Sequence, residues 1–120
     1  MQEALSDLLL TYMKVTINNI DWKIKFTYAS SGDLRRYDGT YTIGMTDNKK
    51  KTIFLYNGLD DALLYKVLCH ELVHAFCFSY GIKMDVEDEE RLAQFVAIYG
   101  RDILGMTDEV IGHILKQKIS

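Results

Sequence analysis

The sequence contains no proline and only two cysteines among its 120 residues. Because proline-rich, repeated and low-complexity segments are all lacking, nothing marks a boundary between domains, and we expect residues 1–120 to form one domain. Cys69 and Cys77 lie eight positions apart in a segment with a helical pattern, about 12 Å along a helix axis. A disulfide needs Cα atoms within about 7 Å. We therefore expect free thiols, which suit a reducing compartment.

Long blocks of one charge and long apolar runs are also lacking. The formal net charge is −3 and the two signs are interspersed, so neither the basic patch of a nucleic-acid-binding protein nor an acidic tail is present. No apolar run approaches the roughly 18 residues of a membrane span, and the first residues are acidic where a secretory signal is basic. These features predict a cytoplasmic protein that binds neither nucleic acid nor membrane.

The periodicity of apolar residues predicts an α+β fold. Apolar residues recur at helical spacing over residues 2–15, which indicates an amphipathic first helix. Alternation of apolar and polar residues predicts three strands, over residues 20–28, 40–46 and 52–56. The last two flank a polar turn at residues 47–50 and form an antiparallel hairpin. We expect a small, three-stranded, mostly antiparallel sheet.

The second half of the chain has a helical pattern. Asp60 is a suitable N-cap, the apolar period continues to Tyr80, and Gly81 suits the position just beyond a helix. A polar connection at residues 82–88 leads to a second long helix, over residues 89–104. The residues of this helix expected to face the core are Leu92, Phe95, Val96 and Tyr99.

A third, shorter helix is expected at the end of the chain. Thr107 is a suitable N-cap there, and the acidic residues Asp108 and Glu109 would complement the N-terminal end of the helix dipole.

The segment "CHELVHAFC", residues 69–77, places two histidines and a glutamate in an otherwise apolar helix. His70 and His74 are four positions apart, so both imidazoles project from one face and can bind one ion. Glu71 is offset by about 100° and can reach a water at that ion without being a ligand. This is the HExxH arrangement of metal-dependent peptidases, and zinc accepts such ligands in tetrahedral geometry. Buried ionisable groups without partners cost several kcal/mol, which a metal relieves.

A catalytic zinc normally has three protein ligands, so the sequence must supply a third. The candidates are Glu87, Glu89, Glu90 and His113. We prefer Glu90, which flanks the apolar stripe of the second long helix. Gln94 lies one turn further on the same face and is expected to accept a hydrogen bond from a zinc-bound histidine.

These residues resemble the gluzincins, whose thermolysin-like members combine HExxH with a later glutamate on a second helix. The segment "ERLAQ", from Glu90 to Gln94, is similar to that pattern, with Gln94 where thermolysin has an aspartate. Closer in size are the minigluzincins and the ImmA/IrrE-type peptidases of phages and mobile elements. The resemblance covers about residues 40–101. It implies a zincin-like fold, one Zn²⁺ per chain, and endopeptidase activity on a peptide or protein substrate with Glu71 as general base.

By the same resemblance, one strand forms the upper rim of the cleft and pairs with an extended substrate. The residues of this expected edge strand are Tyr41, Thr42, Ile43, Gly44, Met45 and Thr46. His113, Tyr80 and Tyr99 are candidates for oxyanion stabilisation by residue type alone, and none is preferred.

Two other functions are compatible with the sequence. One is a non-enzymatic binding or regulatory module, stabilised by zinc, whose fourth coordination position is blocked. The other is a regulator without metal, in which residues 70–74 belong to the core. The presence of Glu71 argues against a purely structural site, which needs no base.

Overall fold

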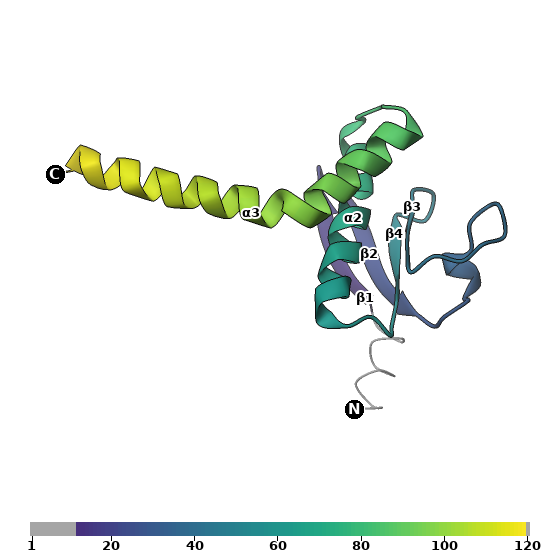
Figure 1. Cartoon of the computed structure of the whole chain (residues 1–120). Coiled ribbons are helices and arrows are strands. Elements are labelled where there is room, and N and C mark those ends of the chain that lie inside the picture. Colours follow the sequence, from purple (N-terminus) through teal and green to yellow (C-terminus); the bar gives the residue numbers. More distant parts are fainter. Residues whose placement is uncertain (1–11, 120) are drawn as a thin grey trace.

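The computed structural model describes residues 12–119, which fold into a mixed sheet and two long helices (Figure 1). The elements are β1 (Tyr12–Ile17), β2 (Ile20–Thr27), the 3-10 helix η1 (Gly32–Leu34), β3 (Gly44–Asp47), β4 (Thr52–Tyr56), α2 (Asp61–Tyr80) and α3 (Val86–Ile119). The α+β class is confirmed.

The sheet has four strands in the described part of the chain, in the order β1-β2-β4-β3, so the prediction of three strands is wrong. The additional strand is β1. Residues 2–11 of the predicted first helix lie outside the described residues, and residues 12–15 belong to β1 instead. Asn18 and Asn19 have φ values of 51° and 63°, the left-handed pair typical of a two-residue hairpin turn, and this turn pairs β1 with β2.

The sheet is also mixed, whereas a mostly antiparallel sheet was predicted. β3 and β4 form the predicted antiparallel hairpin, but β4 runs parallel to β2, with Lys23 opposite Thr52. The strand predicted over residues 40–46 is observed as Gly44–Asp47. Its expected first part pairs elsewhere, because Tyr41 bridges to Arg35 and Thr42 N donates to the Leu34 carbonyl at 2.9 Å.

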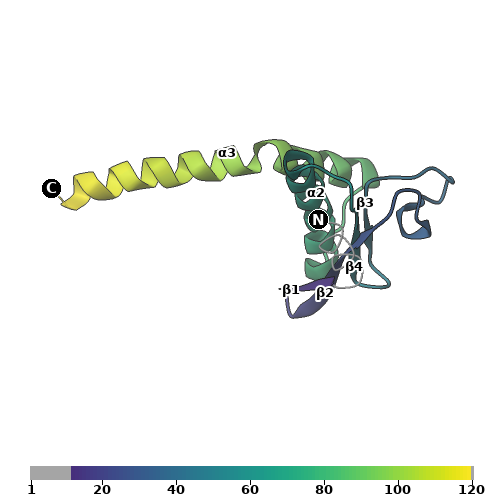
Figure 2. The same cartoon turned by 90° about the horizontal axis from the view of Figure 1, so that it is seen from below.

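The core lies between one face of the sheet and α2. Trp22, Ile53 and Leu55 are fully buried there, and Ala75 is the buried contact from α2. The Trp22 indole N–H donates to Ser79 Oγ at 2.7 Å, so the polar atom of this large side chain has a partner inside the core. These contacts fix α2 along the sheet. α3 packs on α2 (Figure 2).

Both ends of α2 are as predicted. Asp60 accepts a hydrogen bond from Leu63 N at 2.9 Å, and Gly81 ends the helix with a φ of 64°. Asp61–Ser79 is apolar enough to cross a membrane by length and composition alone, contrary to the expectation that no such run exists. This is weak evidence, since core helices of soluble proteins pass the same test. A cytoplasmic location stays a prediction.

α3 is a single helix of 34 residues, where the sequence predicted two helices. It begins at Val86, inside the expected connection, and it continues through Thr107. Thr107 does not cap a helix, because its hydroxyl donates to the Ile103 carbonyl, one turn back within the helix, at 2.8 Å.

The prediction of the core-facing side of α3 is also wrong. Its buried residues are Ala93 and Ala97, whose small side chains allow α2 to approach closely, whereas Leu92, Phe95 and Tyr99 are exposed. The C-terminal half of α3 projects from the body of the protein. The radius of gyration is accordingly 17.2 Å, against about 13–14 Å for a compact chain of this length.

The two cysteines are free, as expected. Burial raises the pKa of both thiols, and Glu89 beside Cys77 raises the pKa of that thiol further. Both therefore remain protonated at neutral pH and are poor metal ligands in this state.

Candidate metal centre

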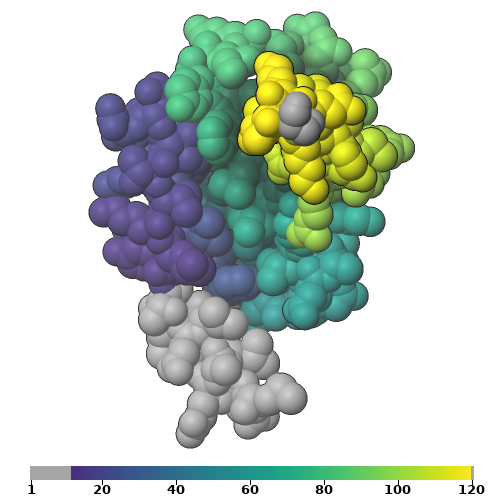
Figure 3. All heavy atoms as spheres, turned by 90° about the vertical axis from the view of Figure 1, so that its left-hand side faces the viewer, coloured from purple at the N-terminus to yellow at the C-terminus, as the bar shows by residue number. Residues whose placement is uncertain are grey.

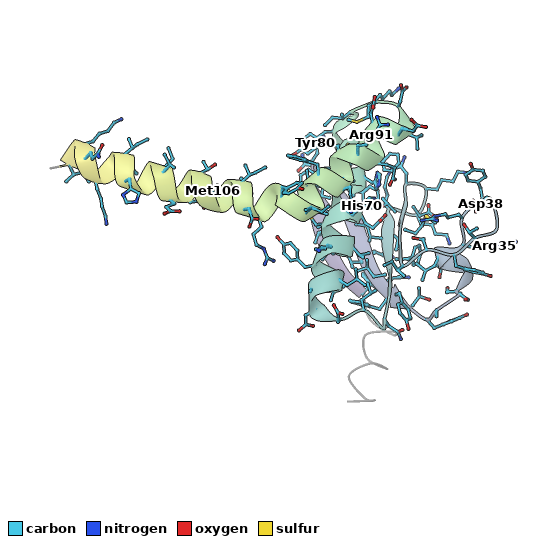
Figure 4. The ribbon with its side chains drawn as sticks, in the orientation of Figure 1. Arg35, Asp38, His70, Tyr80, Arg91 and Met106 are labelled. Atoms are coloured by element: carbon cyan, nitrogen blue, oxygen red, sulfur yellow. The ribbon has the colours of Figure 1, made fainter. Side chains whose placement is uncertain are left out.

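His70 and His74 meet Glu90 where the N-terminal part of α3 crosses α2. Figure 4 labels His70 at this crossing. His70 Nε2 lies 3.0 Å from Glu90 Oε2, and His74 Nε2 lies 2.8 Å from Glu90 Oε1. All three groups offer ligand atoms within 4.8 Å of one another. Zinc–nitrogen bonds of about 2.0–2.1 Å in a tetrahedron place ligand atoms about 3.3 Å apart, so one zinc ion fits among these atoms with small adjustments.

The other ring nitrogens of the two histidines have acceptors. Gln94 Oε1 lies 3.1 Å from His70 Nδ1, and Glu89 Oε2 lies 2.7 Å from His74 Nδ1. A carboxylate or an amide oxygen can only accept, so Nδ1 is the donor in each of these two contacts and each Nε2 faces Glu90. An Nε2 lone pair that faces a carboxylate at these distances needs a cation between the two groups; without one, Nε2 must itself donate a proton to the carboxylate. The donor set thus suits a metal ion.

Glu89 is the residue whose position the sequence interpretation missed. It was considered only as a competing third ligand, whereas the structure places it on the outer nitrogen of His74. Consecutive helical residues point about 100° apart. That offset allows Glu90 to face both histidines, while Glu89 contacts His74 but not His70.

The other candidate ligands lie away from this group. Among the described residues, the cluster able to hold a metal consists of His70, His74 and Glu90. Glu87 is exposed and contacts Arg91, and His113 is exposed on the projecting half of α3.

Glu71 lies beside the histidines and is buried against β3, with 9% of its surface exposed. The Thr46 hydroxyl lies 2.9 Å from Glu71 Oε1 and 3.0 Å from the Glu71 carbonyl oxygen. Burial raises the pKa of the Glu71 carboxyl, although the hydroxyl of Thr46 and the nearby histidines act to lower it. A carboxyl with a raised pKa is a stronger base than an ordinary glutamate, which suits proton abstraction.

These groups open into one cleft of about 940 Å³ between α2, α3 and the β3 side of the sheet. Arg35, Arg36 and Lys66 line it together with the acidic pair Glu89 and Glu90. The expected oxyanion candidates Tyr80 and Tyr99 do not line this cleft, and neither does His113. The cleft therefore presents cations as well as the candidate metal ligands to a bound molecule.

β3 is an edge strand, and two of its residues present free main-chain groups beside the cleft. Tyr56 N donates to the Ile43 carbonyl, so the alternation of an antiparallel ladder directs Met45 toward β4 and turns the main-chain groups of Gly44 and Thr46 outward. The edge available to an extended segment is thus shorter than residues 41–46, because Tyr41 and Thr42 already pair with the loop around η1.

Gly44 lies so close to α2 that any side chain would collide with it. A Cβ there would lie 2.6 Å from Val67 Cγ1 and 3.1 Å from Glu71 Cγ. We expect Gly44→Ala to destabilise the protein by about 1–3 kcal/mol, since overpacking forces neighbours apart. Urea unfolding measures this, with Gly32→Ala as control because a Cβ on Gly32 meets nothing within 4 Å. Equal stabilities of the two variants would contradict the observed contact.

The contacts of the two glutamates predict a graded loss of zinc. Glu89→Ala removes an outer partner of His74 and should lower zinc affinity by about 10–100-fold. Glu90→Ala removes a direct ligand and should lower it further. Competition with a chromogenic chelator measures both, and Glu87→Ala in the same turn is the unchanged control. A larger loss in Glu89→Ala than in Glu90→Ala would show that the ligand assignment is wrong.

No known protein family matches the chain, and no curated protein or solved structure matches it either.

Proposed function

We propose that this protein is a zinc-dependent endopeptidase with a zincin-like arrangement of helices and edge strand. The single observation that supports it best is the convergence of His70, His74 and Glu90, with the buried carboxylate of Glu71 beside them in an open cleft. Two imidazoles and one carboxylate are a donor set typical of catalytic zinc, which keeps one position open. The proposed site therefore holds one zinc ion per chain.

Zinc in such a site supplies Lewis acidity, which polarises a carbonyl group and acidifies water. In the proposed reaction Glu71 takes a proton from the water that attacks the peptide carbonyl and later delivers it to the leaving amine. The Thr46 hydroxyl fixes one carboxylate oxygen of Glu71, so the other oxygen is available for this transfer. Gln94 and Glu89 contact the two Nδ1 atoms and so orient both imidazoles with Nε2 directed inward.

The substrate in this proposal is an extended peptide or protein segment paired with the free edge of β3. Gly44 and Thr46 offer outward main-chain groups next to Glu71, and added-strand pairing is a common way to bind an extended chain. Gly44 has no side chain to separate the edge from α2. The segment would therefore lie close to the proposed base.

The test combines metal analysis with a cleavage assay on the purified chain. We expect one zinc per chain, cleavage of unfolded casein or of a peptide library, loss of cleavage after chelation, and recovery when zinc is returned. A chain without bound zinc would refute the proposal. A chain that holds zinc but cleaves none of the library would instead support a zinc-stabilised binding module, because the metal would then serve stability alone.

A further inference from the structure

An apolar stripe runs along nearly the whole of α3 on a side that α2 does not cover. Its residues, called here the α3 seam, are Leu92, Val96, Tyr99, Ile103, Met106, Val110 and Ile114. They follow one another at spacings of four and three in alternation up to Val110, which is a heptad period. The α2-facing residues Ala93 and Ala97 lie on a different face. The seam therefore has the pattern of a coiled-coil helix.

The projecting half of α3 carries a second row of apolar residues beside the seam. Leu104, Ile111 and Leu115 continue the row that begins with Ala93 and Ala97 on α2, but here α2 no longer lies alongside. Residues 102–119 are all exposed, and Met106 lies well out on the projecting part (Figure 4). An apolar face this broad on a lone helix is suited to a groove between two helices.

We propose that two copies of this chain dimerise by antiparallel pairing of their α3 seams. In this arrangement the projecting half of each α3 lies along the Leu92–Tyr99 part of the partner's α3. Its second apolar row then faces the uncovered side of the partner's α2, which is visible between α3 and the first two strands in Figure 3. That side of α2 carries the exposed aromatic residues Phe76 and Tyr80, and also Tyr65, over whose ring the Arg101 guanidinium of the same chain lies at 3.5 Å.

Charge complementarity favours this partner and this orientation. The first turn of α3 carries Glu87 and Asp88, both exposed and both in contact with Arg91 one turn further on, and the last turn carries Lys116 and Lys118. Antiparallel pairing places the acidic start of one helix beside the basic end of the other at both ends of the dimer. Parallel pairing would bring like charges together, which is destabilising.

The apolar area available is that of a stable dimer. Nine apolar residues of the seam and the second row are each between 39% and 67% exposed; they are Leu92, Tyr99, Ile103, Leu104, Met106, Val110, Ile111, Ile114 and Leu115. Together they expose on the order of 800 Å² per chain, which matches the contribution of one partner to a standard interface.

The same residues argue against a lipid surface as the partner. Helices that lie on membranes have a polar face rich in lysine and arginine. The polar side chains of residues 101–119 balance instead, with Arg101, Lys116 and Lys118 against Asp102, Asp108 and Glu109. The seam also leaves the candidate metal centre open, because Leu92 and Val96 follow Glu90 and Gln94 by two positions and point about 200° away from them.

The mass of the full-length chain in solution tests the proposal. Sedimentation or light scattering at micromolar concentration should give twice the 13.9 kDa of one chain. The double variant Met106→Glu, Val110→Glu should weaken association by at least about 100-fold, because it buries charges without partners. Gly105→Glu is the matched control, since its neighbours one turn away on either side are all charged and a Cβ there meets nothing within 4 Å. Circular dichroism shows whether each variant keeps its helices.

A monomeric wild-type chain would overturn the proposal, whether or not it binds lipid vesicles in a parallel assay. Equal dissociation by Gly105→Glu and by the seam variant would overturn it as well. The orientation has its own test: Lys116→Glu with Lys118→Glu should weaken the homodimer. Mixing that variant with one carrying Glu87→Lys and Asp88→Lys should restore association. Undiminished association of each charge variant alone would exclude the antiparallel arrangement.

Discussion

Glu71→Gln is expected to abolish peptide hydrolysis, lowering kcat by about 10⁴-fold, the upper end for loss of a general base. The substitution removes the proton acceptor but keeps the shape of the side chain. The amide oxygen of glutamine can still accept a hydrogen bond from the Thr46 hydroxyl, which lies 2.9 Å from Glu71 Oε1. Because a buried amide costs less to desolvate than a carboxylate, the thermal stability should be unchanged or slightly higher.

The measurement is cleavage of a peptide library, with zinc content determined on the same samples. Glu109→Gln is the matched control, since it makes the same chemical change at an exposed position of α3. Equal cleavage by the wild-type chain and Glu71→Gln would mean that the activity comes from another site or a contaminant. Zinc lost together with activity would mean instead that Glu71 is needed for metal binding.

His74→Ala is expected to remove zinc binding and, with it, the stabilisation that zinc gives to the folded chain. A ligand present at a thousand times its Kd stabilises the folded state by about 4 kcal/mol. The wild-type Tm should therefore rise when zinc is added to the metal-free protein. The Tm of His74→Ala should not respond.

The readout is the difference in Tm with and without zinc, because His74 also contacts Glu89 and Glu90 in the absence of metal. His113→Ala is the matched control, since this histidine is exposed on the projecting half of α3. A His74→Ala chain that still binds one zinc would place the metal elsewhere. That result would also refute the proposed function, which assigns His74 as a zinc ligand.

Local signals in the sequence predicted local structure well. Asp60 and Gly81 set the ends of α2 as expected, because a cap depends on hydrogen bonds within one turn of the helix. Thr107 shows the limit of such signals. A threonine followed by acidic residues suggests a cap, yet its hydroxyl can equally bond one turn back inside a continuous helix.

Features that depend on pairing between distant segments could not be predicted from local sequence patterns. The parallel alignment of β4 with β2 joins residues such as Lys23 and Thr52, and no local pattern reports it. The strand β1 had a signal that was overlooked, since two asparagines between apolar runs are typical of a hairpin turn. The apolar stripe of α3 was assigned to the core because periodicity shows that a face is apolar but not what covers it.

The candidate site also combines features that local spacing predicts with features that depend on the packing of distant segments. The pairing of His70 with His74 follows from their spacing alone. The contacts of Glu89 with His74 and of Gly44 with Val67 depend on how α3 crosses α2 and how β3 lies against it. Those placements are set by the whole core.

The course of α3 has a mechanical consequence. Glu90 and Met106 lie on one continuous helix, about 24 Å apart along its axis, and the helix changes direction between the part packed on α2 and the projecting part (Figure 1). Gly100 and Gly105 lie in this stretch, and glycine weakens the interior of a helix. A force that tilts the projecting half is therefore taken up first by this bend, and only the remainder reorients the Glu90 carboxylate relative to the two histidines.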